Sequence, residues 1–401
     1  MTKRLLIIGA GFAGMWSALS AARAADEVGR SNELEIVVLA PEARLNIRPR
    51  FYETDLSEAS FPLAELFEVT GVRFVEGFAE QIDPDTRAVT YIGHNQVRES
   101  IHYDRLILAT GSRLAAPNVP GLGQYNFSND KLPDAQRLQR HLLALGELPD
   151  TLTRNTVVVA GGGFTGIETA AELPSYLRRI LGDNTAIQVI VVERADAIGP
   201  DLGPGPRPVI EQALSELGVT VRLGVGVSAI DPKGVVLSDG SRIESQTVIW
   251  TAGLQASELT RQIAGERDRL GRLHVTPELR VIGQENIFAA GDTAYAATDD
   301  KGHHALMSCQ HAMNLGRSAG HNAAADLLYI PTIPYDQVNY VTCLDIGPWG
   351  AVQTEGWDRQ VKLTGAEAKK LKQQINTVWI SPPRADRAEA FAAADPHRRL
   401  V

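Results

Sequence analysis

The sequence predicts an α/β fold, because two glycine-rich turns each stand between an apolar strand and a helix-forming run. Residues 3–8 are an apolar run of strand length, and residues 9–14 (GAGFAG) form the turn that follows. Residues 13–25 are then rich in Ala, Leu and Met, which is typical of a helix. The same order of features recurs at residues 156–160, 161–166 (GGGFTG) and 167–180. Two such units indicate parallel sheets with helices packed on them.

The three glycines of each turn have different tasks when a β-α-β unit binds a dinucleotide. The first permits a tight turn, the second lets the backbone approach the pyrophosphate, and the third lets the helix pack closely on the strand. The phosphates then contact the free N–H groups at the start of the helix. The glycines at these positions are Gly9, Gly11 and Gly14 in the first unit and Gly161, Gly163 and Gly166 in the second. The sequence thus predicts two Rossmann-like dinucleotide-binding domains; the alternative is that one unit has lost its ligand.

The end of each unit's second strand helps to define its ligand. In the second unit, residues 186–193 form an apolar strand that ends in Glu193, whose carboxylate can accept hydrogen bonds from the adenine-ribose hydroxyls and favours NADH. Arg194 follows and is able to pair with a 2′-phosphate, so NADPH stays open. In the first unit the strand of residues 35–40 has no acid at its tip, and Glu42 is either the ribose ligand or a plain surface acid.

Length and composition exclude several classes of protein. A chain of 401 residues has room for two or three domains, and a net charge of −9 argues against a nucleic-acid-binding protein, which is usually basic. The two cysteines, Cys309 and Cys343, are too few for a disulfide framework and suit a reducing compartment. No run approaches the roughly 18 apolar residues of a membrane span, and the N-terminus lacks the features of a signal peptide. We therefore expect a cytoplasmic protein.

Four further segments follow the order of one known family. They are NIRPRFYE at residues 46–53, YDRLILATGS at 103–112, TVIWTAG at 247–253 and IFAAGD at 287–292. With the two glycine turns they resemble the two-dinucleotide-binding-domain flavoproteins, and within these most closely the type II NADH dehydrogenases. The resemblance extends over residues 1 to about 325 and implies FAD and a nicotinamide dinucleotide as cofactors.

The resemblance also implies a nested domain arrangement. Residues 1–115 and 272–333 would form a split FAD-binding domain, with an NAD(P)-binding domain of residues 116–271 inserted in it. Residues 334–401 would form a small C-terminal α+β module on the acceptor side. The positions expected to contact FAD are Gly9, Gly11, Gly14, Glu42, Arg48, Thr110, Gly111, Gly291 and Asp292, and those expected to contact the nicotinamide cofactor are Gly161, Gly163, Gly166, Glu193 and Gly253.

The pair Gly291-Asp292 also has an interpretation that does not depend on the family. A strand that ends in Ala-Ala-Gly lets the backbone approach a ligand, and an acid after the glycine can accept hydrogen bonds from sugar-alcohol hydroxyls. The alternative is that Asp292 caps the N-terminus of the segment that follows.

Glu168 is the predicted catalytic residue on the nicotinamide side. It lies two residues after Gly166, and we expect it in the first turn of the second helix. In the resembling family this glutamate lies beside the nicotinamide and the flavin, and the resemblance implies the same place for Glu168. The alternative is a carboxylate favoured there only by the helix dipole. Glu172, one turn further on, is a weaker candidate on the same face, and Pro174 is expected to kink the helix or end it early.

The sequence leaves the electron acceptor open. No cysteine precedes Cys309, which excludes the dithiol relay of related reductases, so electrons must pass directly from reduced flavin to a quinone, a heterocycle, a ferric complex or oxygen. Residues 305–314 (ALMSCQHAMN) resemble the stretch that lines the quinone site of type II NADH dehydrogenases. Gln310 matches that stretch, whereas Cys309 and Asn314 depart from it.

Gln310 and His311 are the predicted catalytic residues on the acceptor side. His311, like His303 and His304 before it, is a candidate for proton delivery to a reduced quinone or heterocycle, because an unperturbed imidazole titrates near neutral pH. The alternative is that each is a surface or helix-capping histidine. No Cys or acidic ligand accompanies them at helical spacing, so no metal site is predicted.

The C-terminal region is predicted to cover the flavin. Residues 341–357, which contain three glycines, suggest a small antiparallel sheet, and residues 364–379 suggest a helix. We interpret this helix as packed on the core with its lysines in solvent, in preference to one that lies on an anionic membrane. Residues 384–401 are expected to form an exposed tail or an arm exchanged in a homodimer.

Together these features predict an FAD-dependent NAD(P)H:acceptor oxidoreductase, which takes a hydride from NADH and reduces a quinone or quinone-like small molecule. Two alternatives stay open. One is a tailoring or detoxifying flavoenzyme that acts on an aromatic or heterocyclic metabolite, and the other is a slow-turnover flavin redox sensor or partner-binding protein. Contact with a membrane would be at most peripheral, at its inner face.

Overall fold

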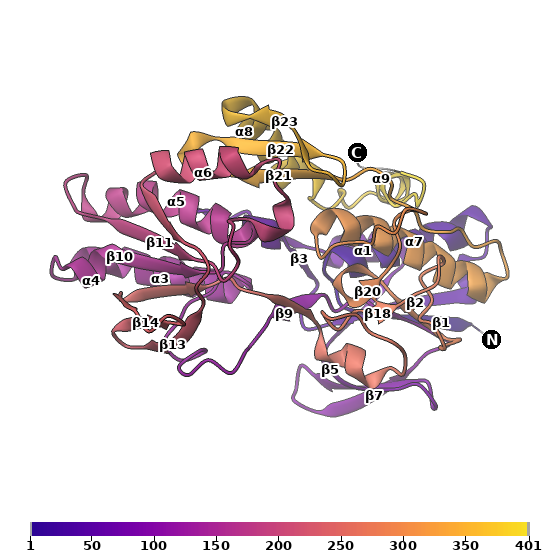
Figure 1. Cartoon of the computed structure of the whole chain (residues 1–401). Coiled ribbons are helices and arrows are strands. Elements are labelled where there is room, and N and C mark those ends of the chain that lie inside the picture. Colours follow the sequence, from indigo (N-terminus) through magenta and orange to yellow (C-terminus); the bar gives the residue numbers. More distant parts are fainter. Residues whose placement is uncertain (1, 399–401) are drawn as a thin grey trace.

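The computed structural model describes residues 2–398 and contains two mainly parallel sheets in two lobes (Figure 1). The first sheet has the strand order β19-β8-β1-β2-β5-β6-β7; its first five strands are parallel and the last two extend it as an antiparallel meander. Its strands are β1 (Lys3–Ile8), β2 (Leu34–Ala40), β5 (Arg73–Asp83), β6 (Ala88–Gly93), β7 (Arg98–His102), β8 (Arg105–Leu108) and β19 (Ile287–Ala289). Because β19 pairs with β8 and lies far from it along the chain, a long segment is inserted between them.

The inserted segment contains the second sheet, whose four parallel strands have the order β12-β11-β10-β16. The chain enters this lobe through β9 (Ser112–Leu114) and leaves it through β17 (Leu254–Ala256), and these two strands pair antiparallel. The other strands of this lobe are β10 (Thr156–Ala160), β11 (Gln188–Val192), β12 (Val219–Arg222), β13 (Val227–Asp231), β14 (Gly234–Leu237), β15 (Arg242–Glu244) and β16 (Thr247–Trp250). The predicted α/β fold with two strand–turn–helix units is therefore confirmed.

The helix after each glycine turn packs on its own sheet. In the first lobe, α1 (Phe12–Glu27) is largely buried and packs along α7 (Cys309–Leu328). The two helices approach closely because α7 carries glycines: a Cβ on Gly320 would lie 2.1 Å from the carbonyl oxygen of Ser17. The other helices of the two lobes are α2 (Ala64–Thr70), α3 (Leu132–Ala144), α4 (Leu152–Asn155), α5 (Phe164–Leu181) and α6 (Arg207–Glu216), and the short strands are β3 (Arg44–Asn46), β4 (Ser60–Pro62), β18 (Leu273–His274) and β20 (Ala294–Tyr295).

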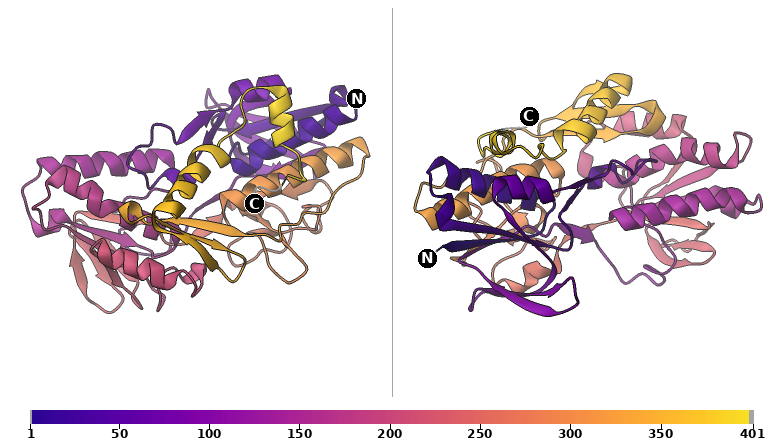
Figure 2. Two further views of the ribbon diagram at one scale, coloured as in Figure 1. Left: turned by 90° about the horizontal axis from the view of Figure 1, so that it is seen from above. Right: turned by 180° about the vertical axis from the view of Figure 1, so that it is seen from behind.

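The C-terminal module lies across both lobes, as the gold-to-yellow segment in Figure 2 shows. An antiparallel sheet of β21 (Val341–Asp345), β22 (Ala351–Glu355) and β23 (Gln360–Thr364) leads into α8 (Gly365–Gln374). α8 continues into one π-helical turn, Ile375–Trp379, and α9 (Arg387–Ala393) follows. The expected sheet and helix are both present, and within residues 2–398 no helix combines the length and apolar composition needed to cross a bilayer.

The helix expected over residues 167–180 is present as α5. It does not end early at Pro174 but continues to Leu181, because Leu173 and Leu177 on either side of the proline are buried in the core, which offsets the one lost hydrogen bond. The segment from residue 384 to 398 is not an exposed tail. α9 packs on α1 and α2, with Ala390 fully buried, because its apolar face consists of small alanines that fit against these helices. Residues 399–401 of the expected tail lie outside the described residues.

Candidate active site

The first glycine turn has the shape of a phosphate-binding loop. Gly9 has a φ of +110°, and a Cβ there would lie 2.4 Å from the carbonyl oxygen of Ala109. A Cβ on Gly14 would lie 1.9 Å from the carbonyl oxygen of Gly9, because the start of α1 lies directly on the turn. By contrast, a Cβ on Gly11, the N-cap of α1, would have no atom within 4 Å. The space over Gly11 is open to a phosphate, which the free N–H groups of α1 are placed to bind.

The second turn repeats this geometry. Gly161 has a φ of +118°, and its Cβ would lie 2.9 Å from the backbone of Ala252. A Cβ on Gly166 would lie 1.9 Å from the carbonyl oxygen of Gly161, whereas one on Gly163, the N-cap of α5, would meet nothing within 4 Å. Both turns therefore fit the pyrophosphate of a dinucleotide.

The acids expected near the ribose groups differ in their surroundings. Glu193 directly follows β11, and its carboxylate accepts hydrogen bonds from the backbone N–H of Gly162 at 2.7 Å and of Ala195 at 2.8 Å. These bonds fix the carboxylate beside the second turn and leave further lone pairs for ribose hydroxyls. Arg194 is exposed next to it, and Glu42 is exposed two residues after β2.

Asp292 lies after β19, close to the first turn. Ser112 Oγ donates a hydrogen bond of 2.6 Å to its Oδ2, and Arg48 Nη1 lies 4.0 Å from the same oxygen. Burial raises the pKa of Asp292, while the hydrogen bond from Ser112 and the charge of Arg48 oppose that rise. The alternative role as an N-cap is wrong, because Ser308 is the residue that caps the next α-helix, α7.

Three further predicted contacts lie where the chain crosses between the lobes. Thr110 and Gly111 stand between β8 and β9, and Gly253 stands between β16 and β17. Both glycines have left-handed backbone, with φ of +66° and +73°. Thr110 Oγ1 is buried without a hydrogen-bond partner among the described residues. A buried polar atom of this kind is well placed to bind a cofactor that enters here.

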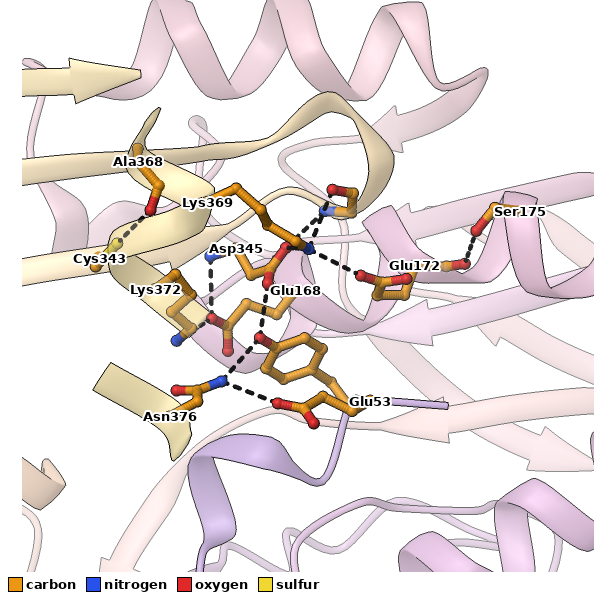
Figure 3. Close-up of polar contacts among 12 residues, drawn as sticks. Glu53, Glu168, Glu172, Ser175, Cys343, Asp345, Ala368, Lys369, Lys372 and Asn376 are labelled. Atoms are coloured by element: carbon orange, nitrogen blue, oxygen red, sulfur yellow. Dashed lines mark hydrogen bonds and ion pairs between the residues drawn. The ribbon is translucent and has the colours of Figure 1, made fainter. Parts of the chain in front are cut away.

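Glu168 is buried where α5 meets α8 and β21 (Figure 3). Its Oε1 lies 2.8 Å from Lys372 Nζ and accepts a hydrogen bond of 3.1 Å from the backbone N–H of Asp345. Because α5 begins at Phe164, Glu168 lies in the second turn of the helix, and the prediction that it lies in the first turn is wrong. The helix dipole acts mainly within the first turn, so it is a weaker explanation for this carboxylate than the ion pair.

The Glu168–Lys372 pair is able to hold a proton close to neutral pH. Burial raises the pKa of Glu168 to about 7, although Lys372 and the bond from Asp345 lower it. Burial alone would lower the pKa of Lys372, but the carboxylate beside it raises this pKa above its usual value. Lys372 is therefore charged at pH 7 while Glu168 is near its midpoint, which is typical of groups at functional sites.

A second ion pair lies beside the first. Lys369 Nζ is 2.5 Å from Asp345 Oδ1 and 3.3 Å from Glu172 Oε1, so Glu172, the weaker catalytic candidate, pairs with the C-terminal module. The expectation that the lysines of α8 lie in solvent is thus wrong for Lys372, which is 4% exposed, and for Lys369, which is partly buried. The helix packs its charged face onto α5 because buried carboxylates there compensate the ammonium groups.

The sequence did not indicate Lys372, Asp345 or Tyr52 as site residues. Asp345 and Glu168 are 177 positions apart, so no local pattern connects them. The sequence contains only weak signals for them. Tyr52 lies within the segment 46–53 that resembles the family, and Lys369 and Lys372 are spaced to share one face of a helix.

On the acceptor side, His311 is fully buried in the first turn of α7. Its Nδ1 lies 2.9 Å from Ser308 Oγ, and burial, with the charges of Arg359 and Arg272, lowers its pKa to about 3. The imidazole is therefore neutral at pH 7, and the expectation that it titrates near neutrality is wrong. His311 Nε2 and Gln310 Oε1 are buried without a partner among the described residues, which makes both atoms available to a bound ligand.

The other polar residues of this stretch make contacts within the protein. His303 pairs with Asp299 at 2.5 Å and stacks on Trp357, and His304 stacks on Tyr295. No group of His, Cys, Asp and Glu within residues 2–398 has the arrangement of a metal site. Asn314 Oδ1 accepts a hydrogen bond of 3.0 Å from Arg317, which draws it into the helix packing.

Both cysteines are free thiols. Cys343 lies on β21 and donates to the carbonyl oxygen of Ala368 over 3.5 Å. Burial raises the pKa of Cys309 to about 11 and that of Cys343 to about 12, so neither is a thiolate at neutral pH. The thiols therefore lack the reactivity that a redox relay needs.

Known proteins are similar to this chain in sequence and in fold. The "NADH dehydrogenase-like protein" of Mycobacterium tuberculosis is 46% identical over 397 residues, which cover 98% of both chains. The demethylphylloquinone reductase of Synechocystis is 30% identical over 376 residues, 91% of this chain and 89% of that protein. A solved structure titled as NDH2 from Plasmodium falciparum in complex with NADH has a TM-score of 0.78 at 15% identity and covers 98% of both chains, so the fold is the same. Residues 3–316 match the pyridine nucleotide-disulphide oxidoreductase family, and this chain belongs to that family.

Proposed function

We propose that this protein is an FAD-dependent NAD(P)H:acceptor oxidoreductase that oxidises NADH and reduces a quinone or quinone-like small molecule without a redox disulfide. The observation that carries the proposal is the pair of glycine turns, each with an open N-cap glycine at the start of a helix. The names of the two relatives, an NADH dehydrogenase-like protein and a demethylphylloquinone reductase, support NADH as the donor and a quinone as the acceptor. The two free thiols support direct electron transfer.

We assign FAD to the first turn and NADH to the second. The FAD-binding domain would comprise residues 1–115 and 272–333, the NAD(P)-binding domain residues 116–271, and the acceptor-side module residues 334–401. Glu193, held at the end of β11, supports NADH over NADPH. The further residues that would hold FAD are Arg48, Thr110, Gly111, Gly291 and Asp292, with Glu42 as a surface candidate, and Gly253 would approach the nicotinamide cofactor.

When bound, FAD would supply the redox chemistry of the reaction, the uptake of a hydride and the delivery of two electrons. On the side of the second turn, Glu168 takes up or releases a proton close to neutral pH beside the charged Lys372, and both side chains are buried away from water. On the acceptor side, Gln310 and the neutral imidazole of His311 bind by hydrogen bonds and do not act as a charged acid. Glu168 is therefore the residue to which we assign proton transfer.

A tailoring or detoxifying flavoenzyme is the second candidate. It is favoured by the contact between Asn314 and Arg317, since Asn314 departs from the quinone-site stretch of the family and is bonded within the protein. We further propose that the protein is cytoplasmic, with at most peripheral contact to the inner face of the membrane. Its two free thiols support a reducing compartment. A homodimer stays a prediction.

Spectroscopy of the purified protein tests the proposal. The protein should carry a yellow flavin, NADH should bleach it without oxygen, and a short-chain quinone should reoxidise it faster than oxygen does. A colourless protein, or a flavin that NADH does not reduce, overturns the proposal. Reduction by NADH followed by slow reoxidation with quinones favours the second candidate.

A further inference from the structure

Asp345 connects three parts of the chain around Glu168 (Figure 3). It is the last residue of β21 and is 4% exposed. Its backbone N–H donates to Glu168 Oε1 over 3.1 Å, so the C-terminal module contacts α5 directly. Its Oδ2 accepts a hydrogen bond of 2.9 Å from the hydroxyl of Tyr52 in the first lobe. Its Oδ1 accepts bonds from Lys369 Nζ at 2.5 Å and from the Gly347 N–H at 2.9 Å.

These bonds determine the position of the Glu168 carboxylate. Both carboxylate oxygens of Asp345 are bonded, which holds its backbone N–H in place. The two contacts of Glu168 both fall on Oε1, from Asp345 and from Lys372. Asp345 and Lys372 together therefore hold this carboxylate oxygen in place.

The charges around Glu168 have opposite effects on its pKa. Among residues 2–398, the titratable groups that interact with Glu168 are Lys372 of α8, Asp345 and Cys343 of β21, and Tyr52 of the first lobe. Cys343 and Tyr52 are uncharged at neutral pH, because burial raises the pKa of both well above 7. Beyond burial itself, Lys372 and the N–H of Asp345 favour the ionised carboxylate, whereas the negative charge of Asp345 opposes it.

We propose that Asp345 is a positioning residue for the reaction: its N–H orients Glu168, and its carboxylate sets how readily Glu168 releases its proton. The inference rests on the proposed function, in which Glu168 acts beside the nicotinamide. Lys369 moderates the effect of Asp345, because its ammonium lies 2.5 Å from Asp345 and partly neutralises it.

The primary test is Asp345→Asn in the holoenzyme, which keeps the size and the backbone N–H but removes the charge. We expect the ionisation seen in the pH profile of anaerobic flavin reduction by NADH to move to lower pH by about 0.5 to 1 unit. The matched control is Glu172→Gln, which removes a carboxylate that pairs with the same Lys369 but does not contact Glu168. It should move the ionisation much less.

Lys369→Gln provides a test in the opposite direction. It leaves the charge of Asp345 without its nearest counter-ion, so the ionisation of Glu168 should move to higher pH. Lys369 is partly exposed, so this variant is less disruptive and decides the inference if Asp345→Asn does not fold.

A readout independent of turnover comes from carboxyl-¹³C NMR of glutamate-labelled holoenzyme. The signal of Glu168 is identified by its absence in Glu168→Gln, and its titration midpoint should follow the same two shifts. An unmoved midpoint in both Asp345→Asn and Lys369→Gln overturns the inference. Equal shifts in Asp345→Asn and Glu172→Gln also overturn it, because they indicate a general loosening around Lys369. A failure of the proposed function looks different: NADH does not reduce the flavin, whatever the titration reports.

Discussion

At the residue scale, substitution of the second glycine of a turn should weaken ligand binding, whereas substitution of the third should lower stability. Gly166→Ala would place a Cβ 1.9 Å from a backbone oxygen, and we expect a loss of about 3 kcal/mol or more in the free energy of unfolding. Gly163→Ala places its Cβ in open space at a φ of −78°, which alanine adopts freely, so stability should not change. NADH affinity should instead fall about tenfold or more, because the methyl group occupies the phosphate position.

Urea unfolding of the FAD-loaded variants and NADH titration of the flavin absorbance measure these two effects. Normal NADH affinity in Gly163→Ala would show that the pyrophosphate does not lie on this turn. A fully stable Gly166→Ala would contradict the close contact between α5 and the strand before it.

Replacing Glu168 should lower the free energy of unfolding more than replacing Lys372, although the two form one buried pair. Glu168→Gln leaves a buried ammonium uncompensated and should cost about 3 kcal/mol or more. Lys372→Met should cost less at pH 7, about 1–2 kcal/mol, because the pKa of Glu168, about 7 beside Lys372, rises when the lysine is removed and the carboxyl group then takes up a proton. The double variant should lose less than the sum of the two. Urea unfolding of all three at pH 7 measures the coupling, and strictly additive losses would mean that the two side chains do not interact.

At the scale of elements, the contact between α1 and α7 depends on small residues. Gly320→Ala improves the helix propensity of α7 by about 1 kcal/mol. The new Cβ would nevertheless lie 2.1 Å from the Ser17 carbonyl oxygen, and overpacking against backbone costs about 1–3 kcal/mol or more. We expect the cost of overpacking to exceed the gain in helix propensity, so the midpoint of thermal unfolding should fall by several degrees. An unchanged or higher midpoint would contradict the close packing of these helices.

The elements show where sequence patterns are reliable. The strands Lys3–Ile8 and Thr156–Ala160 were predicted to the residue, because an apolar run bounded by glycines has a sharp local signal. α9 was missed, because an alanine-rich face has little apolar contrast until α1 and α2 bury it. The helix over residues 167–180 was predicted, but the early end that Pro174 suggested does not occur, since burial of the residues beside the proline outweighs the lost backbone bond.

At the scale of the whole molecule, buried titratable groups predict how stability depends on pH. His311 has its pKa lowered from 6.5 to about 3, so its contribution is present above pH 6.5 and is lost as the pH falls toward 3. Between pH 7 and pH 5 this loss amounts to about 2 kcal/mol. His311→Asn, which preserves a polar contact to Ser308 but does not ionise, should reduce the loss on acidification by about that amount.

Urea unfolding of wild type and variant at both pH values measures this difference. Glu168 contributes with the opposite sign in the same window, because its raised pKa favours the folded state at low pH, and this contribution cancels when variant and wild type are compared. Equal losses on acidification in both proteins would contradict a buried neutral His311.

The sequence by itself determined that this chain has two dinucleotide-binding units and no dithiol relay. Both conclusions depend on local facts: glycine spacing next to an apolar strand, and the lack of any cysteine before Cys309. Only the tertiary structure decided that Lys372 and Asp345 control the protonation state of Glu168. It also decided that His311 stays neutral. Proton affinity depends on burial and on charges brought together from three separate parts of the chain, and neither is encoded in the spacing of neighbouring residues.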